Sequence, residues 1–245
     1  MSSSLRLFGV AIAVLMSQAA CTAATPVFDK PSSVINLGNW KLSIPVMDSS
    51  DEHPLEIRQP ELNEHSSQYM FVAGGKKEVV FQTPTHSAVQ PGSEYPRTEL
   101  REMTEGGQAK AKWSNTDSIH ELVVEQAVTV LPSTKPSVVV GQIHDSKGFV
   151  VLIRLDGTHL YVKTEDGDID TLDDHYDLGR FFALKITAGG GNVMVYYNNQ
   201  LKETYRKKCS SCYFKAGIYL QTNADMEDGE SHGEVHIRRL DVMHY

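Results

Sequence analysis

The segment YFKAGIYLQ (213–221) alternates apolar and polar side chains with the period of two that is typical of a β-strand. Its apolar positions are Phe214, Ala216, Ile218 and Leu220. Its polar positions are Tyr213, Lys215, Tyr219 and Gln221, with Gly217 expected to leave open space between Lys215 and Tyr219. The apolar row predicts a face packed on a hydrophobic core. The polar row belongs either to a solvated face or to a functional site.

Short segments of similar character follow one another along the rest of the chain, separated by Gly, Asn, Asp and Pro. The Asp156-Gly157 pair predicts a tight hairpin, and a single short helix is expected at 56–61. Many short strands without a long helical pattern predict an all-β fold, a β-sandwich or jelly roll. The expected strands are 40–44, 78–82, 98–103, 119–131, 138–144, 150–155, 159–164, 180–187, 193–197, 213–221 and 234–243.

The chain has 245 residues and a formal net charge of −8. This length fits a single domain, which we expect over residues 25–245. The acidic balance argues against nucleic acid as a partner, because nucleic-acid-binding domains usually carry a basic surface. It does not exclude an anionic substrate, because the local potential of a groove governs what binds there.

The first 24 residues resemble a secretory signal peptide, with an apolar run at 7–16 followed by small residues. The run is too short to span a bilayer, so no membrane span is expected. Cleavage before Cys21 would leave a lipid anchor on that residue, and cleavage near Ala23 or Ala24 would release the protein. We therefore expect a secreted or periplasmic protein, with an outer-membrane lipoprotein as the alternative.

Cys209 and Cys212 are the two cysteines of the domain expected over residues 25–245. In an oxidising compartment this pair could close a small loop. A CxxC redox motif is the alternative, but it usually accompanies a βαβ pattern that this sequence lacks. No second CxxC or spaced His pair completes a zinc site. The pair therefore predicts a structural disulfide.

Two further strands carry polar residues on one face. In RTELR (97–101) Arg97, Glu99 and Arg101 share a face, and Glu99 could hold both guanidinium groups. In VVVGQIH (138–144) Gln142 and His144 share a face at the end of an apolar strand. The simpler alternatives are an exposed ladder of charges and a histidine satisfied within the core.

Together with WKLSIP (40–45), the segments RTELR, QIH (142–144) and YFKAGIYLQ resemble, in this order, the signature regions of the family 7 polysaccharide lyases, the alginate lyases. The resemblance covers residues 27–245. It implies a jelly-roll β-sandwich of two antiparallel sheets with a concave groove. It also implies cleavage of alginate, a polymer of mannuronate and guluronate, by β-elimination to unsaturated oligosaccharides.

The resemblance assigns catalysis to Arg97, Gln142, His144 and Tyr219. Arg97 and Gln142 would bind the C5 carboxylate, because the C5 proton is a poor acid beside an uncompensated charge. His144 would remove that proton and Tyr219 would protonate the leaving oxygen, if nearby cations such as Lys215 and Arg101 make its phenol more acidic. On mannuronate Tyr219 could do both. An Ile within QIH favours guluronate-containing blocks, and endo action is expected.

The substrate-binding residues expected from these strands are Glu99, Arg101, Lys215 and Gln221, with Lys41 and Tyr213 as further candidates. We expect no cofactor and no metal site. The acidic segments 165–174 and 225–230 do not match an EF-hand and are expected to be solvated loops. The protein is expected to be a monomer.

Two other functions remain open at this point. A jelly roll could bind carbohydrate without catalysis, although binding alone needs neither a base nor a phenol. A lyase acting on another polyuronate, such as glucuronan, would use the same groups. Glycoside hydrolysis is disfavoured, because no strand carries a close pair of carboxylates on one face.

Overall fold

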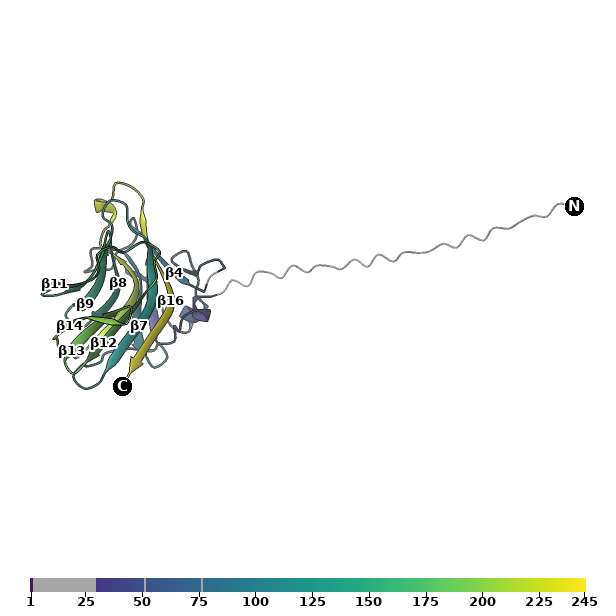
Figure 1. Ribbon diagram of the computed structural model, residues 1–245. Helices are drawn as coiled ribbons and strands as arrows, with labels where there is room; N and C mark the ends of the chain where they lie inside the picture. Colours follow the sequence, from purple (N-terminus) through teal and green to yellow (C-terminus); the bar gives the residue numbers. More distant parts are fainter. Residues whose placement is uncertain (2–29, 51, 76) are drawn as a thin grey trace.

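The protein is a sandwich of two antiparallel β-sheets, described here from a computed structural model (Figure 1). The structure describes residues 1, 30–50, 52–75 and 77–245. Apart from Met1, the predicted signal peptide with its Cys21 lies outside the described residues. Within these ranges the helices are short: η1 (Pro31–Ser33), α1 (Glu61–Glu64) and η2 (Ala224–Met226).

Sheet A has nine strands, eight of them on one continuous path. The short strand β6 (Ala109–Lys110) pairs with β5 beside this path. In spatial order the path is β11 (Gly167–Asp173), β10 (His159–Thr164), β9 (Phe149–Asp156), β8 (Ser137–His144), β15 (Tyr213–Leu220), β5 (Arg97–Thr104), β1 (Trp40–Met47) and β2 (Pro54–Ile57).

Sheet B has seven strands and packs on the inner face of sheet A. Its order is β14 (Gln200–Tyr205), β13 (Asn192–Tyr197), β12 (Phe182–Gly189), β7 (His120–Val130), β16 (His232–His244), β4 (Val79–Pro84) and β3 (Met70–Val72). This arrangement confirms the predicted fold class of two antiparallel sheets.

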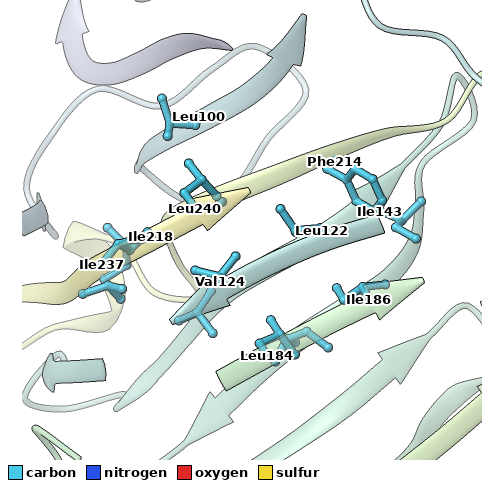
Figure 2. Close-up of a cluster of buried hydrophobic side chains, with 14 of the residues drawn as sticks. Leu100, Leu122, Val124, Ile143, Leu184, Ile186, Phe214, Ile218, Ile237 and Leu240 are labelled. Atoms are coloured by element: carbon cyan, nitrogen blue, oxygen red, sulfur yellow. The ribbon is translucent and has the colours of Figure 1, made fainter. Parts of the chain in front are cut away.

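The core lies between the sheets and takes one row of alternating residues from each strand (Figure 2). Leu100, Phe214 and Ile218 enter it from sheet A, while Leu122 and Leu184 enter it from sheet B. Each such side chain contributes about 1.5–3 kcal/mol by leaving water. Because strand side chains alternate, burying this row directs the polar row of β5, β8 and β15 to the outer face of sheet A.

The hairpin and the disulfide that the sequence predicts are both confirmed. Gly157 adopts a φ of 61° between β9 and β10, a conformation that a glycine tolerates without steric cost. Cys209 and Cys212 are joined in a disulfide just before β15. Cys212 also pairs with Trp113 in an isolated β-bridge, so the disulfide fixes the approach to β15.

The helix expected at 56–61 is misplaced. Residues 54–57 form strand β2, in which Ile57 pairs with Leu42 of β1, and the helical turn begins at Glu61. Pairing with a distant strand determines the conformation of this segment, and the local pattern does not contain that information.

The two acidic segments are also not simply solvated loops. Residues 167–173 form the edge strand β11, whose exposed, charged Asp168 suits a sheet edge. In the second segment the Glu227 carboxylate is buried and accepts hydrogen bonds from the backbone amides of Thr134 and Lys135. It satisfies backbone donors that would otherwise be buried without partners.

Candidate active site

Three neighbouring strands of sheet A bring the four predicted catalytic residues together. Strand β15 lies between β5 and β8, although the three strands are far apart in the chain. In the register of these strands, Tyr219 pairs with Arg97, and Lys215 pairs with both Arg101 and Gln142. The outer face of this region holds a cavity of about 460 Å³. Among its lining residues are Arg97, Gln142, His144, Tyr213, Lys215 and Tyr219.

Gly217 forms a β-bulge between Lys215 and Tyr219, and the expectation of open space there is wrong. Its φ is 118°, and a Cβ at this position would lie 2.7 Å from the carbonyl oxygen of Thr98. The register with β8 shifts by one residue between Ala216 and Tyr219. A bulge of this kind reorients the side chains that follow it, here that of Tyr219.

Glu99 lies at the centre of a buried ionic network beneath the cavity and is 3% exposed. Its carboxylate contacts Lys215 Nζ at 2.5 Å and Arg97 Nη1 at 3.3 Å, and it accepts a hydrogen bond from Gln142 Nε2. This burial excludes the exposed ladder of charges. The network contains two cations and one anion, so it favours an anionic ligand above it.

The pKa values in this network reflect burial and charge. Burial alone would raise the pKa of Glu99, but Lys215, Arg97 and Gln142 outweigh it and hold that pKa below its usual value. Burial, with help from Arg97 and Arg101, lowers the pKa of Lys215 to about 8 despite its contact with Glu99. At neutral pH the Lys215 ammonium is therefore mostly retained.

His144 is arranged to act as a base. Its Nδ1 lies 2.8 Å from the carbonyl oxygen of Asp145, which can only accept a hydrogen bond, so Nδ1 carries the proton in the neutral ring. The lone pair then lies on Nε2. Burial, with Lys215 and Arg97, lowers the pKa of His144 below its usual value, which keeps the ring neutral at neutral pH. The ring also stacks on Tyr213, whose hydroxyl is 3.1 Å from Nδ1.

Tyr219 places a phenol in the same cavity. The Arg97 guanidinium lies 3.8 Å from the centre of its ring, and Tyr95 packs against it. The phenol oxygen is 3.0 Å from the hydroxyl of Ser93. The cavity therefore offers a neutral imidazole, a phenol and a buried positive charge, which are the groups needed to move a proton next to a carboxylate.

Arg101 has other partners than those expected. Glu99 does not hold it; the guanidinium lies 3.9 Å from the centre of the Tyr213 ring and donates to the backbone oxygens of Glu102 and Ala111. It thus orients Tyr213, which in turn contacts His144. Arg97, rather than Arg101, is the arginine against Tyr219.

Lys41 and Gln221 lie outside this cavity. Lys41 is buried on β1, next to Arg101 in the sheet, and forms an ion pair with Glu56 of β2. Gln221 follows β15, where its side chain contacts the Leu220 carbonyl and Arg154. Both residues are held by protein partners.

Sequence reasoning missed the loop that precedes β5. Gln90, Ser93 and Glu94 line the cavity from this loop, as do Phe149 and Leu152 from β9. The signal for the loop is Pro91-Gly92, a turn pattern four residues before Tyr95-Pro96-Arg97. For Phe149 and Leu152 no local signal distinguishes a cavity wall from a core position.

Among the residues described, no group of three or more His, Cys, Asp or Glu side chains could hold a metal ion. Within the same ranges, no helix combines the length and the apolar character needed to cross a membrane.

Comparisons with known proteins concern the family and the fold of this chain. A family model described as "Alginate lyase" matches residues 35–244. The structure of alginate lyase AlgAT5 from polysaccharide lyase family 7 is 45% identical, with a TM-score of 0.84, covering 88% of this chain and 99% of that one. A search of curated proteins found no match.

Two further solved structures are similar. The alginate lyase from Corynebacterium sp. is 37% identical, with a TM-score of 0.85, covering 89% of this chain and 99% of that one. Alginate lyase A1-II', a member of polysaccharide lyase family 7, is 24% identical with a TM-score of 0.77, covering 88% of this chain and 99% of that one. The latter likeness shows the fold alone.

Proposed function

This chain belongs to the alginate lyases of polysaccharide lyase family 7, and we propose that it cleaves alginate by β-elimination in the cavity of sheet A. The observation that carries this proposal is the combination of a neutral His144, the Tyr219 phenol and the buried Arg97–Glu99–Lys215 network in one cavity. A purely carbohydrate-binding protein needs no such set of proton-transfer groups.

In this mechanism the uronate carboxylate binds beside Arg97 and Gln142, above the net positive charge of the network. Partial neutralisation of the carboxylate makes the C5 proton more acidic. Each hydrogen bond to the carboxylate contributes about 3 kcal/mol to lowering the barrier. The Nε2 atom of His144 takes the C5 proton. The C5–H electron pair forms the C4=C5 double bond, the C4–O4 bond breaks, and O4 receives the proton of Tyr219.

We further propose endo action with a preference for guluronate-containing blocks. In guluronate the C5 proton and O4 lie on opposite sides of the ring, which suits a base and an acid on different strands. His144 is at the end of β8 and Tyr219 on β15. In mannuronate the two groups lie on the same side, and Tyr219 would serve as both base and acid.

The direct test is the ultraviolet absorbance of the new conjugated double bond on incubation with alginate. Polyguluronate, polymannuronate, mixed polymer and glucuronan are compared, with a chelator as a control. We expect a rise with alginate that the chelator leaves intact. Binding of alginate without a rise would favour a carbohydrate-binding module, and a rise with glucuronan alone would favour the other polyuronate. Product sizing over time distinguishes endo from exo action.

The catalytic roles are tested by substitution. His144→Ala and Tyr219→Phe are expected to lower kcat by about 10²–10⁴-fold. Matched controls are His175→Ala, in an exposed loop, and Tyr196→Phe, on sheet B. Full turnover by either cavity variant would contradict its assigned role.

We also propose that residues 1–24 direct export and that the mature protein is a monomer. Mass spectrometry of the mature N-terminus separates a lipidated Cys21 from cleavage near Ala23 or Ala24. An unprocessed Met1 in the exported protein would contradict the signal peptide, and a dimer on gel filtration would contradict the monomer.

A further inference from the structure

The loop before β5 ends in a tight turn that presents Ser93 to the cavity. The amide of Ser93 donates to the carbonyl of Gln90 at 2.9 Å, and Gly92 has a φ of 76°. Proline at the second position and a glycine with positive φ at the third are the pattern of a type II turn. Proline fixes φ at the second position and glycine permits the positive φ at the third, so the turn backbone sets the position of Ser93.

The hydroxyl of Ser93 lies between Arg97, which the proposed mechanism places beside the substrate carboxylate, and Tyr219, which it places at the leaving oxygen. It accepts a hydrogen bond from Arg97 Nη2 at 2.5 Å and lies 3.0 Å from the phenol oxygen of Tyr219. The carbonyl oxygen of Tyr95 is also within reach, but at 3.5 Å.

One of these hydrogen bonds has a fixed direction. Arginine can only donate, so the Ser93 oxygen is the acceptor toward Arg97. Between Ser93 and Tyr219 either hydroxyl can donate, and for the Ser93 proton the Tyr219 oxygen is the closer of two acceptors by half an ångström. With Ser93 as the donor, the phenol's own proton is free to point into the cavity.

We infer that Ser93 donates to the Tyr219 oxygen and is thereby a positioning residue for the elimination, which transmits the charge of Arg97 to that oxygen and directs the phenol proton toward the leaving group. This inference rests on the proposed function, since it assigns the part of the site that protonates O4. When Tyr219 gives up its proton, the negative charge forms on the atom to which Ser93 already donates. Hydrogen bonds to a charged group are worth more than those to a neutral one, so the contact strengthens as the proton leaves.

Several other charged, titratable or aromatic groups surround the Tyr219 phenol, and a test of Ser93 must leave them unchanged. Arg97 lies over its ring from β5, Lys215 is on its own strand and His144 is across the cavity. Glu94 lines the cavity from the loop, and Tyr95 packs against the ring. A substitution at Ser93 removes one neutral hydroxyl and leaves all these groups present.

The test compares Ser93→Ala with Ser93→Thr, which keeps a hydroxyl, and with Ser87→Ala as a matched control. Ser87 is in the same loop, but its hydroxyl donates to the carbonyl of Pro84. Two readouts are used: steady-state kinetics on alginate, and the alkaline titration of Tyr219, obtained as the tyrosinate absorbance difference between each protein and its Tyr219→Phe partner.

For Ser93→Ala we expect kcat to fall by roughly tenfold or more with little change in KM, and the Tyr219 titration to move to higher pH. Ser93→Thr and Ser87→Ala are expected to retain both properties. An unchanged titration in Ser93→Ala would overturn the inference, and so would an equal loss of kcat in Ser87→Ala. If the wild-type protein has no activity on alginate, the proposed function fails, while the titration still decides whether Ser93 acts on Tyr219.

Discussion

At the scale of single residues, the chemistry of the cavity depends on how Lys215 and Glu99 act on His144. Lys215 lowers the pKa of the imidazole and Glu99 raises it, and burial lowers it most. Both side chains are nearly inaccessible to water, which screens their charges little. The two residues should therefore change the pH dependence of the lyase in opposite directions.

The base form of His144 is the neutral ring, so activity on the acid side falls as pH drops through its pKa. Since that pKa lies below 6.5, we expect the acid limb of kcat/KM to have its midpoint below this value. Lys215→Met should move the limb to higher pH and Glu99→Gln to lower pH. The measurement is kcat/KM across the acid range, and shifts of the same sign in both variants would contradict this account.

At the scale of strands, Gly217 allows β15 to approach β5 closely. A methyl group there would meet both the Thr98 carbonyl oxygen at 2.7 Å and the Phe81 ring at 3.1 Å. Gly157, in the β9–β10 hairpin, also has positive φ, but no atom lies within 4 Å of the corresponding position. Replacing each of these two glycines by alanine therefore compares backbone strain with crowding, at Gly217, against backbone strain without crowding, at Gly157.

Gly217→Ala is expected to lower the free energy of unfolding by at least ~3 kcal/mol, from strain and overpacking together. Gly157→Ala should cost only about 1–2 kcal/mol, the penalty of a left-handed conformation. Denaturant unfolding of both variants measures the difference. Equal costs would show that crowding around Gly217 contributes nothing.

A second strand-level feature is the histidine between β16 and β4. The ring of His236 contacts Glu234 at 2.9 Å and Glu78 at 3.0 Å, and these contacts, Glu234 first, raise its pKa above 6.5. A raised folded-state pKa contributes stability fully below the unfolded value and loses it as pH rises through the folded one.

His236→Gln should therefore lower the melting temperature more at about pH 5 than at about pH 9. The matched control is His175→Gln, in an exposed loop. A larger effect of His236→Gln at the alkaline pH would contradict the stabilising role of the protonated ring.

The elements that could be predicted from sequence are those with a one-sided apolar pattern. Strands β5, β8 and β15 were expected from that pattern, together with the polar rows that enter the cavity. The edge strand β14 was missed, because its residues are mostly exposed and carry little alternation. Strands β2 and β11 were assigned as helix and loop, because their conformation comes from pairing with distant partners.

In the candidate site, too, some features follow from the sequence pattern and others depend on contacts between distant segments. Alternation predicts that Arg97 and Tyr219 share a face, but not that Arg97 rather than Arg101 lies against the phenol, since that depends on the register of β5 and β15. Ser93 could not be assigned, because a turn signal shows where a loop bends and not which side chain it brings to a distant strand.

At the scale of the whole molecule, the net charge of −8 and the positive network under the cavity predict opposite responses to salt. Repulsion between an acidic protein and a polyanion is screened by salt, so KM would fall. Attraction within the cavity is also screened, so KM would rise.

We expect the attraction to dominate, with KM for alginate rising with ionic strength and kcat changing little. The measurement is initial rate against alginate concentration at several salt concentrations, with sucrose at matched osmolality as the control. A KM that falls with salt would mean that the overall charge governs encounter with the polymer.

The position of β15 between β5 and β8 has a consequence for how the enzyme comes into being. Residues 97–104, 137–144 and 213–220 are synthesised far apart in time, and the last of them supplies both Lys215 and Tyr219. A nascent or truncated chain without β15 has no central strand to join the other two and lacks the phenol of Tyr219. Turnover of alginate can therefore report that the whole sandwich has closed, which makes it a more stringent assay of complete folding than secondary-structure content.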